Sequence, residues 1–171
     1  SVGGDTLQIE VNVMPGKGVL QMTGQMGDVM KESAQIALTY VRSVASDYGV
    51  KENYFEKHDI HLHIPEGAVP KDGPSAGITM ATAMLSAVTG RKVLPRVAMT
   101  GEVTLRGHVL MIGGLKEKLL AARMAQVEKV LVPAKNQPDV EELSKEITKG
   151  MEIVYIKEMN EVIREAFVPE K

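Results

Sequence analysis

The chain has 171 residues, a formal net charge of −2 and no cysteine. Its length fits one domain of roughly 150 residues, and its 44% hydrophobic and 25% charged residues exclude collagen-like, low-complexity and wholly disordered chains. The balanced charge argues against nucleic acid as a partner, no apolar run is long enough to cross a membrane, and the lack of cysteine excludes disulfides, thiolate metal ligands and a cysteine nucleophile.

The first third of the sequence predicts two strands and a long helix. Residues 7–13 alternate between apolar and polar side chains, which predicts a strand with one buried face. Pro15 to Gly18 predict a turn, so residues 19–22 are expected to return as the second strand of a hairpin. Apolar residues at spacings of three and four predict a helix over 28–48, which Gly49 would end.

The rest of the sequence alternates short strands with helices. A strand at 59–64 leads into a loop at 65–74 rich in proline and glycine, and a helix is expected at 75–88. The later predicted elements are strands at 97–100 and 109–112, a helix at 115–126, a strand at 129–132, a helix from near Pro138 to near Gly150, a strand at 151–156 and a helix at 158–167. Strands and helices therefore mix along a single domain.

A turn-forming segment, Lys71 to Gly77, delivers Ser75 to the start of a predicted helix. The first turn of a helix has unpaired backbone N–H groups and a partial positive charge, which can stabilise a developing oxyanion. Serine is also a preferred helix N-cap. This segment alone leaves both a structural and a nucleophilic role open for Ser75.

A nucleophilic serine needs a base, which could be a histidine or an uncharged lysine. At about 100° per residue, Lys118 falls between Ala122 and Ala125 on the apolar side of its helix, whereas Lys116 projects to the charged side. Burial would lower the pKa of Lys118 toward the range useful for a base. The alternative is a lysine whose stem packs while its ammonium group reaches water.

His61 and His63 lie on the same face of a predicted strand, as two ligands of a zinc site can. A third ligand would have to come from Asp72, Glu102 or His108. A triad of Ser75, His63 and Asp72 is also possible, because triads are defined by geometry and not by chain order. The sequence alone does not choose between these sites.

Two long blocks of the sequence stand out: HLHIPEGAVPKDGPSAG at residues 61–77, and MTGEVTLRG at 99–107 followed by IGGLKEKLLAA at 112–122. Both blocks strongly resemble the Lon family of ATP-dependent proteases. The blocks occur in the family's order, and the likeness runs over nearly the whole chain. Departures are few: Met111 stands where proline is common, and residues 123–126 differ from the usual ending of the lysine helix.

The resemblance implies that Ser75 is the nucleophile and Lys118 the general base of a Ser–Lys dyad. It also implies that Thr100 helps to orient the Lys118 amine, and that His63 and Asp72 lie at or beside the site. Helix geometry selects the same lysine independently. A zinc-assisted hydrolase and a non-catalytic assembly module are the competing functions.

The resemblance further implies a compact α+β domain, with short mixed sheets and helices packed around them, over residues 1–171. We expect this domain to be a fragment of a longer chain whose AAA+ ATPase and N-terminal modules lie outside it. The first residues, Ser1 to Asp5, have no signal-peptide character. The family relation implies a homohexameric ring in the bacterial cytoplasm rather than the mitochondrial matrix.

The expected substrates are unfolded, damaged, short-lived regulatory or degradation-tagged proteins, in the service of protein quality control and the stress response. No cofactor or metal is expected in this chain, and ATP and Mg would bind only to the ATPase module. Neither a membrane nor a nucleic acid is expected as a partner of this domain.

Overall fold

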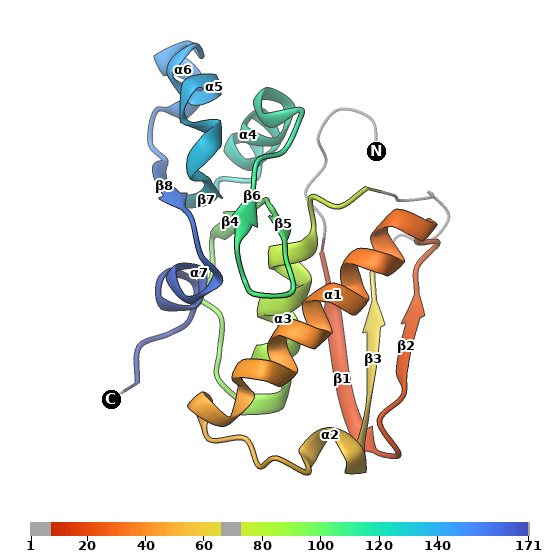
Figure 1. The fold of residues 1–171 in the computed structure, drawn as a ribbon. Helices are drawn as coiled ribbons and strands as arrows, with labels where there is room; N and C mark the ends of the chain where they lie inside the picture. The colour runs from red at the N-terminus through yellow and green to blue at the C-terminus, as the bar shows by residue number, and fades with distance from the viewer. Residues whose placement is uncertain (1–7, 66–72, 171) are drawn as a thin grey trace.

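The computed structural model describes residues 8–65 and 73–170. The elements in chain order are β1 (Glu10–Pro15), β2 (Leu20–Thr23), α1 (Asp28–Val44), the 3₁₀ turn η1 (Ala45–Tyr48), α2 (Tyr54–Lys57), β3 (His58–His63), α3 (Gly77–Thr89), β4 (Val97–Met99), β5 (Glu102–Val103), β6 (Val109–Leu110), α4 (Leu115–Met124), β7 (Lys129–Pro133), η2 (Ala134–Asn136), α5 (Gln137–Glu141), α6 (Lys145–Thr148), β8 (Glu152–Ile156) and α7 (Met159–Ala166). Helices and small mixed sheets share one compact unit, so the expected α+β class is confirmed (Figure 1).

The first sheet has the strand order β1-β3-β2, with β1 antiparallel and β2 parallel to β3. The expected hairpin between β1 and β2 is therefore wrong, because β3 lies between them. Ile60 and Leu62 of β3 are both buried, and a central strand can satisfy its backbone on both edges while it buries such side chains.

The connection between β1 and β2 is held by Asp59 of the inserted strand. Asp59 Oδ1 accepts the N–H groups of Lys17, Gly18 and Val19 at 2.8, 3.0 and 2.8 Å. Gly16 also lies against this carboxylate, so a side chain there would collide with it. The turn residues that suggested a hairpin instead wrap around the end of a third strand.

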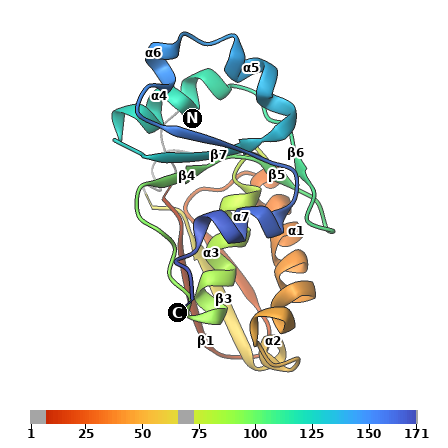
Figure 2. The same cartoon turned by 90° about the vertical axis from the view of Figure 1, so that its left-hand side faces the viewer.

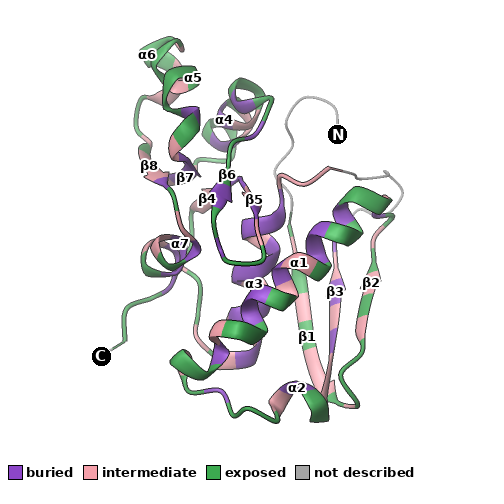
Figure 3. Ribbon diagram, in the orientation of Figure 1, coloured by how far each residue is buried: buried purple, intermediate pink, exposed green. Residues whose placement is uncertain are grey.

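Helices α1 and α3 cover one face of this sheet (Figure 1). Figure 3 shows α3 as mostly buried, whereas α1 is buried along one stripe. Their apolar residues form the first core with the inner face of the sheet, and its fully buried members include Val41, Leu62, Ile78, Met80, Met84 and Leu85. The helix expected at 28–48 is confirmed, except that its last four residues tighten into η1.

The second sheet, β4-β7-β8, is wholly parallel and separates two sets of helices. Figure 2 shows α4, α5 and α6 on one side of it and α7 on the other. Side chains of β7 alternate between these sides: Leu131 joins the first core, and Val130 and Val132 face α4. The second core consists of Ile112, Leu115, Leu119, Ala122, Val130 and Val132.

The structure differs from the predicted elements at several ends. The helix expected from Pro138 to Gly150 is two short helices, because the Ser144 side chain accepts the N–H of Glu146 and caps a new helix there. The helix expected from Ser75 begins at Gly77. The short elements α2 and β5 were not predicted from the periodicity, since each has four residues or fewer.

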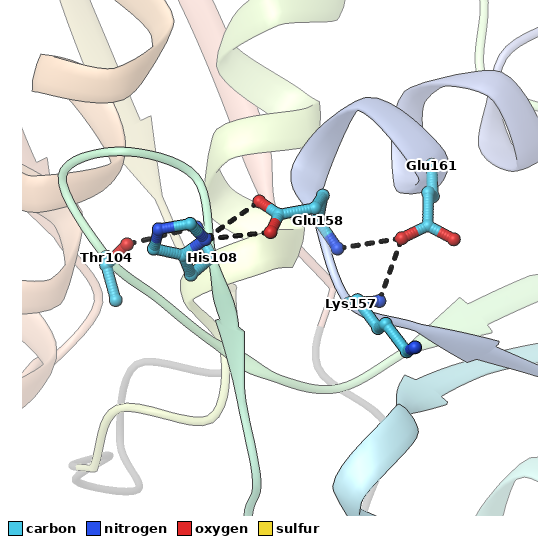
Figure 4. Close-up of polar contacts among 5 residues, drawn as sticks. All are labelled: Thr104, His108, Lys157, Glu158 and Glu161. Atoms are coloured by element: carbon cyan, nitrogen blue, oxygen red, sulfur yellow. Dashed lines mark hydrogen bonds and ion pairs between the residues drawn. The ribbon is translucent and has the colours of Figure 1, made fainter.

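The tip of the β5–β6 hairpin is tied to the start of α7, as Figure 4 shows. His108 Nδ1 lies 2.8 Å and 2.9 Å from the two carboxylate oxygens of Glu158, and the N–H of His108 donates to the Thr104 hydroxyl. Glu161 accepts the N–H groups of Lys157 and Glu158 and completes a capping box. This hairpin connects β4 to α4, so its anchoring constrains both.

Removing the carboxylate of Asp59 is expected to destabilise the first sheet. The N–H groups of Val19 and Lys17 lower the pKa of Asp59 below its ordinary value of 3.8, so its charge contributes stability above that pH, which is lost as the pH falls through the lowered pKa. Asp59→Ala should lower the free energy of unfolding measured in urea. It should also flatten the dependence of that free energy on pH below about pH 4. Asp59→Asn keeps one acceptor oxygen and should lose less.

Glu56→Ala removes an exposed carboxylate from the same end of the sheet and is the matched control. If Asp59→Ala unfolds at the same urea concentration as this control, the carboxylate does not hold the connection.

Candidate active site

Ser75 lies in a tight turn directly before α3. The N–H of Gly77 donates to the carbonyl of Pro74 at 3.1 Å and closes the turn. Ala76, and not Ser75, occupies the N-cap position, and no side chain caps the helix. The capping role considered for Ser75 is therefore wrong, and its hydroxyl is left for another partner.

The backbone of Ser75 is held from behind by the residues that follow β4. The N–H of Gly101 donates to the Ser75 carbonyl at 2.8 Å, and the buried Thr100 hydroxyl donates to the same oxygen at 3.4 Å. The N–H of Ile78 donates in turn to the Gly101 carbonyl at 3.1 Å. A Cβ at Gly101 would lie 2.9 Å from the side chain of Val109 and 3.2 Å from that of Ile78, so the packing of these side chains requires glycine here.

Lys118 reaches Ser75 from α4, on the other side of the site. Its Nζ donates to Ser75 Oγ at 2.7 Å, across 43 positions of sequence. Lys118 is half-buried and Lys116 is exposed, as the helix geometry predicts. Ala122 is buried in the second core, whereas Ala125 lies past the end of the helix and is exposed.

Burial lowers the pKa of Lys118 below its ordinary value of 10.5. The physical cause is desolvation, which penalises the ammonium form and leaves the neutral amine unaffected. A neutral amine keeps a lone pair that can accept a proton from a hydroxyl 2.7 Å away. The site therefore combines a serine hydroxyl with an amine biased toward the basic form.

The remaining expected site residues differ in where they lie. Thr100 was expected to orient the Lys118 amine, and its hydroxyl bond in the structure goes to the Ser75 carbonyl. The ring of His63 contacts the Thr23 hydroxyl through Nδ1 at 2.6 Å, and His61 contacts the same hydroxyl through Nε2 at 2.9 Å. Asp72 lies outside the described residues.

Within residues 8–65 and 73–170, no three histidine or acidic side chains are grouped closely enough to hold a metal ion. The same part of the chain contains no helix with the length and apolarity that a membrane crossing requires.

The sequence analysis missed Gly101 and Asn136. Gly101 had a signal, because a glycine directly after a short apolar strand often marks a close backbone approach. Asn136 had none: its fully buried side chain binds Ile112, 24 positions away, and nothing in its local sequence points there.

A serine hydroxyl bonded to a half-buried lysine amine is the arrangement of a Ser–Lys hydrolase. Comparison with known proteins agrees with this class. Residues 1–169 match the family described as the Lon protease (S16) C-terminal proteolytic domain. The chain therefore belongs to this family of serine peptidase domains, and the resemblance seen in its sequence is confirmed.

The chain is similar to three bacterial proteins, each named a Lon protease. It is 67% identical to the Lon protease of Lachnoclostridium phytofermentans over 168 residues. The aligned part is 98% of this chain and 21% of the relative. The corresponding values are 54% over 171 residues for Lon protease 1 of Bacillus subtilis (100% and 22%) and 57% over 166 residues for Heliobacterium modesticaldum (97% and 20%). The chain thus spans about a fifth of the length of these curated relatives.

The lowered pKa of Lys118 predicts that stability rises with pH. Between the lowered pKa and 10.5 the unfolded chain binds more protons than the folded one, so the free energy of unfolding increases through that window and levels off above it. Burial also raises the pKa of Tyr40 to about 12, which lowers stability only above its ordinary value of 10.0.

The measurement is urea unfolding from pH 7 to 10 for the wild type and Lys118→Met. The difference between them isolates Lys118, because the tyrosines are common to both. We expect the wild type to gain stability relative to Lys118→Met as the pH rises. The difference in stability between the wild type and Lys116→Met should not change with pH in this way. Parallel curves for the wild type and Lys118→Met would show that the amine has an ordinary pKa.

Proposed function

We propose that this chain hydrolyses peptide bonds, with Ser75 as the nucleophile and Lys118 as its general base. The observation that supports this most directly is the 2.7 Å bond between Lys118 Nζ and Ser75 Oγ, formed where burial favours the neutral amine. Membership of a proteolytic domain family agrees with it. In this proposal Thr100 acts on Ser75 by fixing the position of its carbonyl.

In the acylation half-reaction, neutral Lys118 takes the proton of the Ser75 hydroxyl as Oγ attacks the peptide carbonyl carbon. The resulting tetrahedral oxyanion collapses, and the C–N bond breaks as the Lys118 ammonium gives its proton to the leaving amine. Ser75 is then an ester of the acyl half of the substrate. Lys118 next takes a proton from water, which attacks the ester, and returns that proton to Ser75 Oγ as the carboxylic acid leaves.

The turn around Ser75 limits which backbone groups can stabilise the oxyanion. The N–H groups of Gly77 and Ile78 already donate to the carbonyls of Pro74 and Gly101. The N–H groups of Ser75 and Ala76 are therefore our candidates for oxyanion donors. One such donor typically contributes about 3 to 4 kcal/mol to transition-state stabilisation.

The longer relatives suggest the setting in which this domain works. Each is about five times the length of the chain, which supports the proposal that an AAA+ ATPase module with bound ATP and Mg lies elsewhere in the same protein. That module would unfold damaged, short-lived or degradation-tagged proteins and feed them into a hexameric ring of these domains in the bacterial cytoplasm. His63 and, outside the described residues, Asp72 remain candidates for supporting roles.

Replacing the nucleophile tests the proposal directly. Ser75→Ala should abolish both the cleavage of an unfolded casein-type substrate and covalent labelling by a fluorophosphonate probe, because no Oγ remains to form the adduct. Ser46→Ala removes an exposed serine hydroxyl from the first half of the chain and should label like the wild type. Mass spectrometry locates the adduct, and labelling that persists in Ser75→Ala would assign the nucleophile elsewhere.

Replacing the base tests the second half of the proposal. Lys118→Met keeps an unbranched apolar stem but removes the amine, and it should reduce peptide cleavage by about 10²- to 10⁴-fold, the typical contribution of a general base. The fold should be retained, since desolvation of a charged group is relieved. Lys116→Met, on the exposed side of α4, should cleave at the wild-type rate. Normal cleavage by Lys118→Met would exclude this lysine as the base.

A further inference from the structure

The Lys118 helix is preceded by a segment with little packing of its own. Of residues 110–114, only Ile112 is buried. The next two residues are glycines, and Gly114 has a left-handed backbone with φ of +69°. Because glycine has the greatest backbone freedom, this link does not by itself fix where α4 begins.

The buried side chain of Asn136 binds the backbone of Ile112 in this segment. Its Oδ1 accepts the Ile112 N–H at 3.0 Å, and its Nδ2 donates to the Ile112 carbonyl at 2.9 Å. The second Nδ2 hydrogen goes to Asp139 Oδ2 at 2.7 Å. The amide thus pairs with both backbone groups of one residue, as a neighbouring strand would, and Asp139 fixes its orientation.

The two halves of this clamp come from different parts of the domain. Asn136 ends η2, directly after β7, and β7 pairs with β4 next to Thr100. The N–H of Thr100 also donates to the carbonyl of Leu131 in β7 at 3.1 Å. Hydrogen bonds, together with the chain from Leu131 to Asn136, therefore connect the support behind Ser75 to the residue six positions before Lys118.

We infer that Asn136 is a positioning residue for the reaction, which sets the reach of Lys118 to Ser75 by fixing Ile112 at the start of the lysine segment. The inference rests on the proposed roles of Ser75 and Lys118. Leu115 and Leu119 pack α4 into the second core, and such apolar packing is non-directional. The bonds of Asn136 add a directional restraint to it.

The test compares Asn136→Ala and Asn136→Asp with the wild type. Alanine removes the clamp, and aspartate keeps the shape but places a carboxylate oxygen against the Ile112 carbonyl. Both should lower kcat for peptide cleavage by about tenfold to a hundredfold with little change in KM, since misplacing a reacting group costs rate more than ground-state binding. Lys118 should be better solvated in these Asn136 variants, which raises its pKa. The increase of kcat/KM that accompanies deprotonation of Lys118 should therefore occur at higher pH.

A titration of the Lys118 side chain by NMR supplies a readout that does not depend on activity. The pKa of Lys118 should be below 10.5 in the wild type and return toward that value in both Asn136 variants. An ordinary pKa in the wild type would overturn the proposed base and not the clamp. A lowered pKa and full kcat in folded Asn136 variants would overturn the positioning role alone.

Milder variants keep the test decisive where the Asn136 variants fail to fold. Asp139→Ala leaves both Ile112 bonds but frees the amide, so its effects should be smaller in the same direction, and Asp139→Asn should restore wild-type behaviour by keeping an acceptor oxygen. Val41→Ala is the control, because it loosens the first core on α1, away from α4. It should lower stability without moving the pKa of Lys118, and wild-type kinetics in Asp139→Ala would contradict the inference.

Discussion

The contact between Lys118 Nζ and Ser75 Oγ is the interaction on which the site depends, and it joins two separately packed halves of the domain. Ser75 lies in the turn that leads into α3, which is buried in the first core, whereas Lys118 belongs to α4, which packs on the second. The contact exists only if both cores keep their relative position. The distance between Lys118 Nζ and Ser75 Oγ therefore depends on how the two cores are joined.

The parallel sheet β4-β7-β8 provides that join. Its central strand sends Leu131 into the first core and Val130 and Val132 into the second, so neither core can shift without the other. Thr100 and Gly101 continue from β4 to the back of Ser75, and the β5–β6 hairpin carries the chain on to α4. The hydrogen bond between His108 and Glu158 ties that hairpin to α7 (Figure 4).

What the sequence could predict follows from the range of the interactions involved. Lys118 was identified by its position on a helix, because periodicity reports which side of a helix is apolar. The hairpin of β1 and β2 was predicted wrongly, since the strand that separates them comes about 40 residues later and local turn residues give no sign of it. The break at Ser144 was missed because the surrounding residues also suit one longer helix.

The residues that hold the site were harder to find from the sequence than the two residues that meet in it. Ser75 and Lys118 lie in blocks whose order and spacing resemble a known family, so both could be named from the sequence. Asn136 acts through a pair of bonds to the backbone of Ile112, and a backbone contact leaves no mark on the identity of its partner. The same holds for Gly101, whose N–H supports the Ser75 carbonyl.

Ser75 and Lys118 differ in how firmly the surrounding structure holds them. Ser75 is fixed through its own backbone, by the N–H of Gly101 and the hydroxyl of Thr100, in the turn before a helix that is buried in the first core. Lys118 extends a long side chain from α4, a helix of ten residues whose outer face is exposed and whose start follows two glycines. A lysine amine also gains hydration free energy whenever it moves outward. Lys118 is thus the partner that tends to move away from the contact, and keeping it there needs directional restraint on α4 in addition to apolar packing.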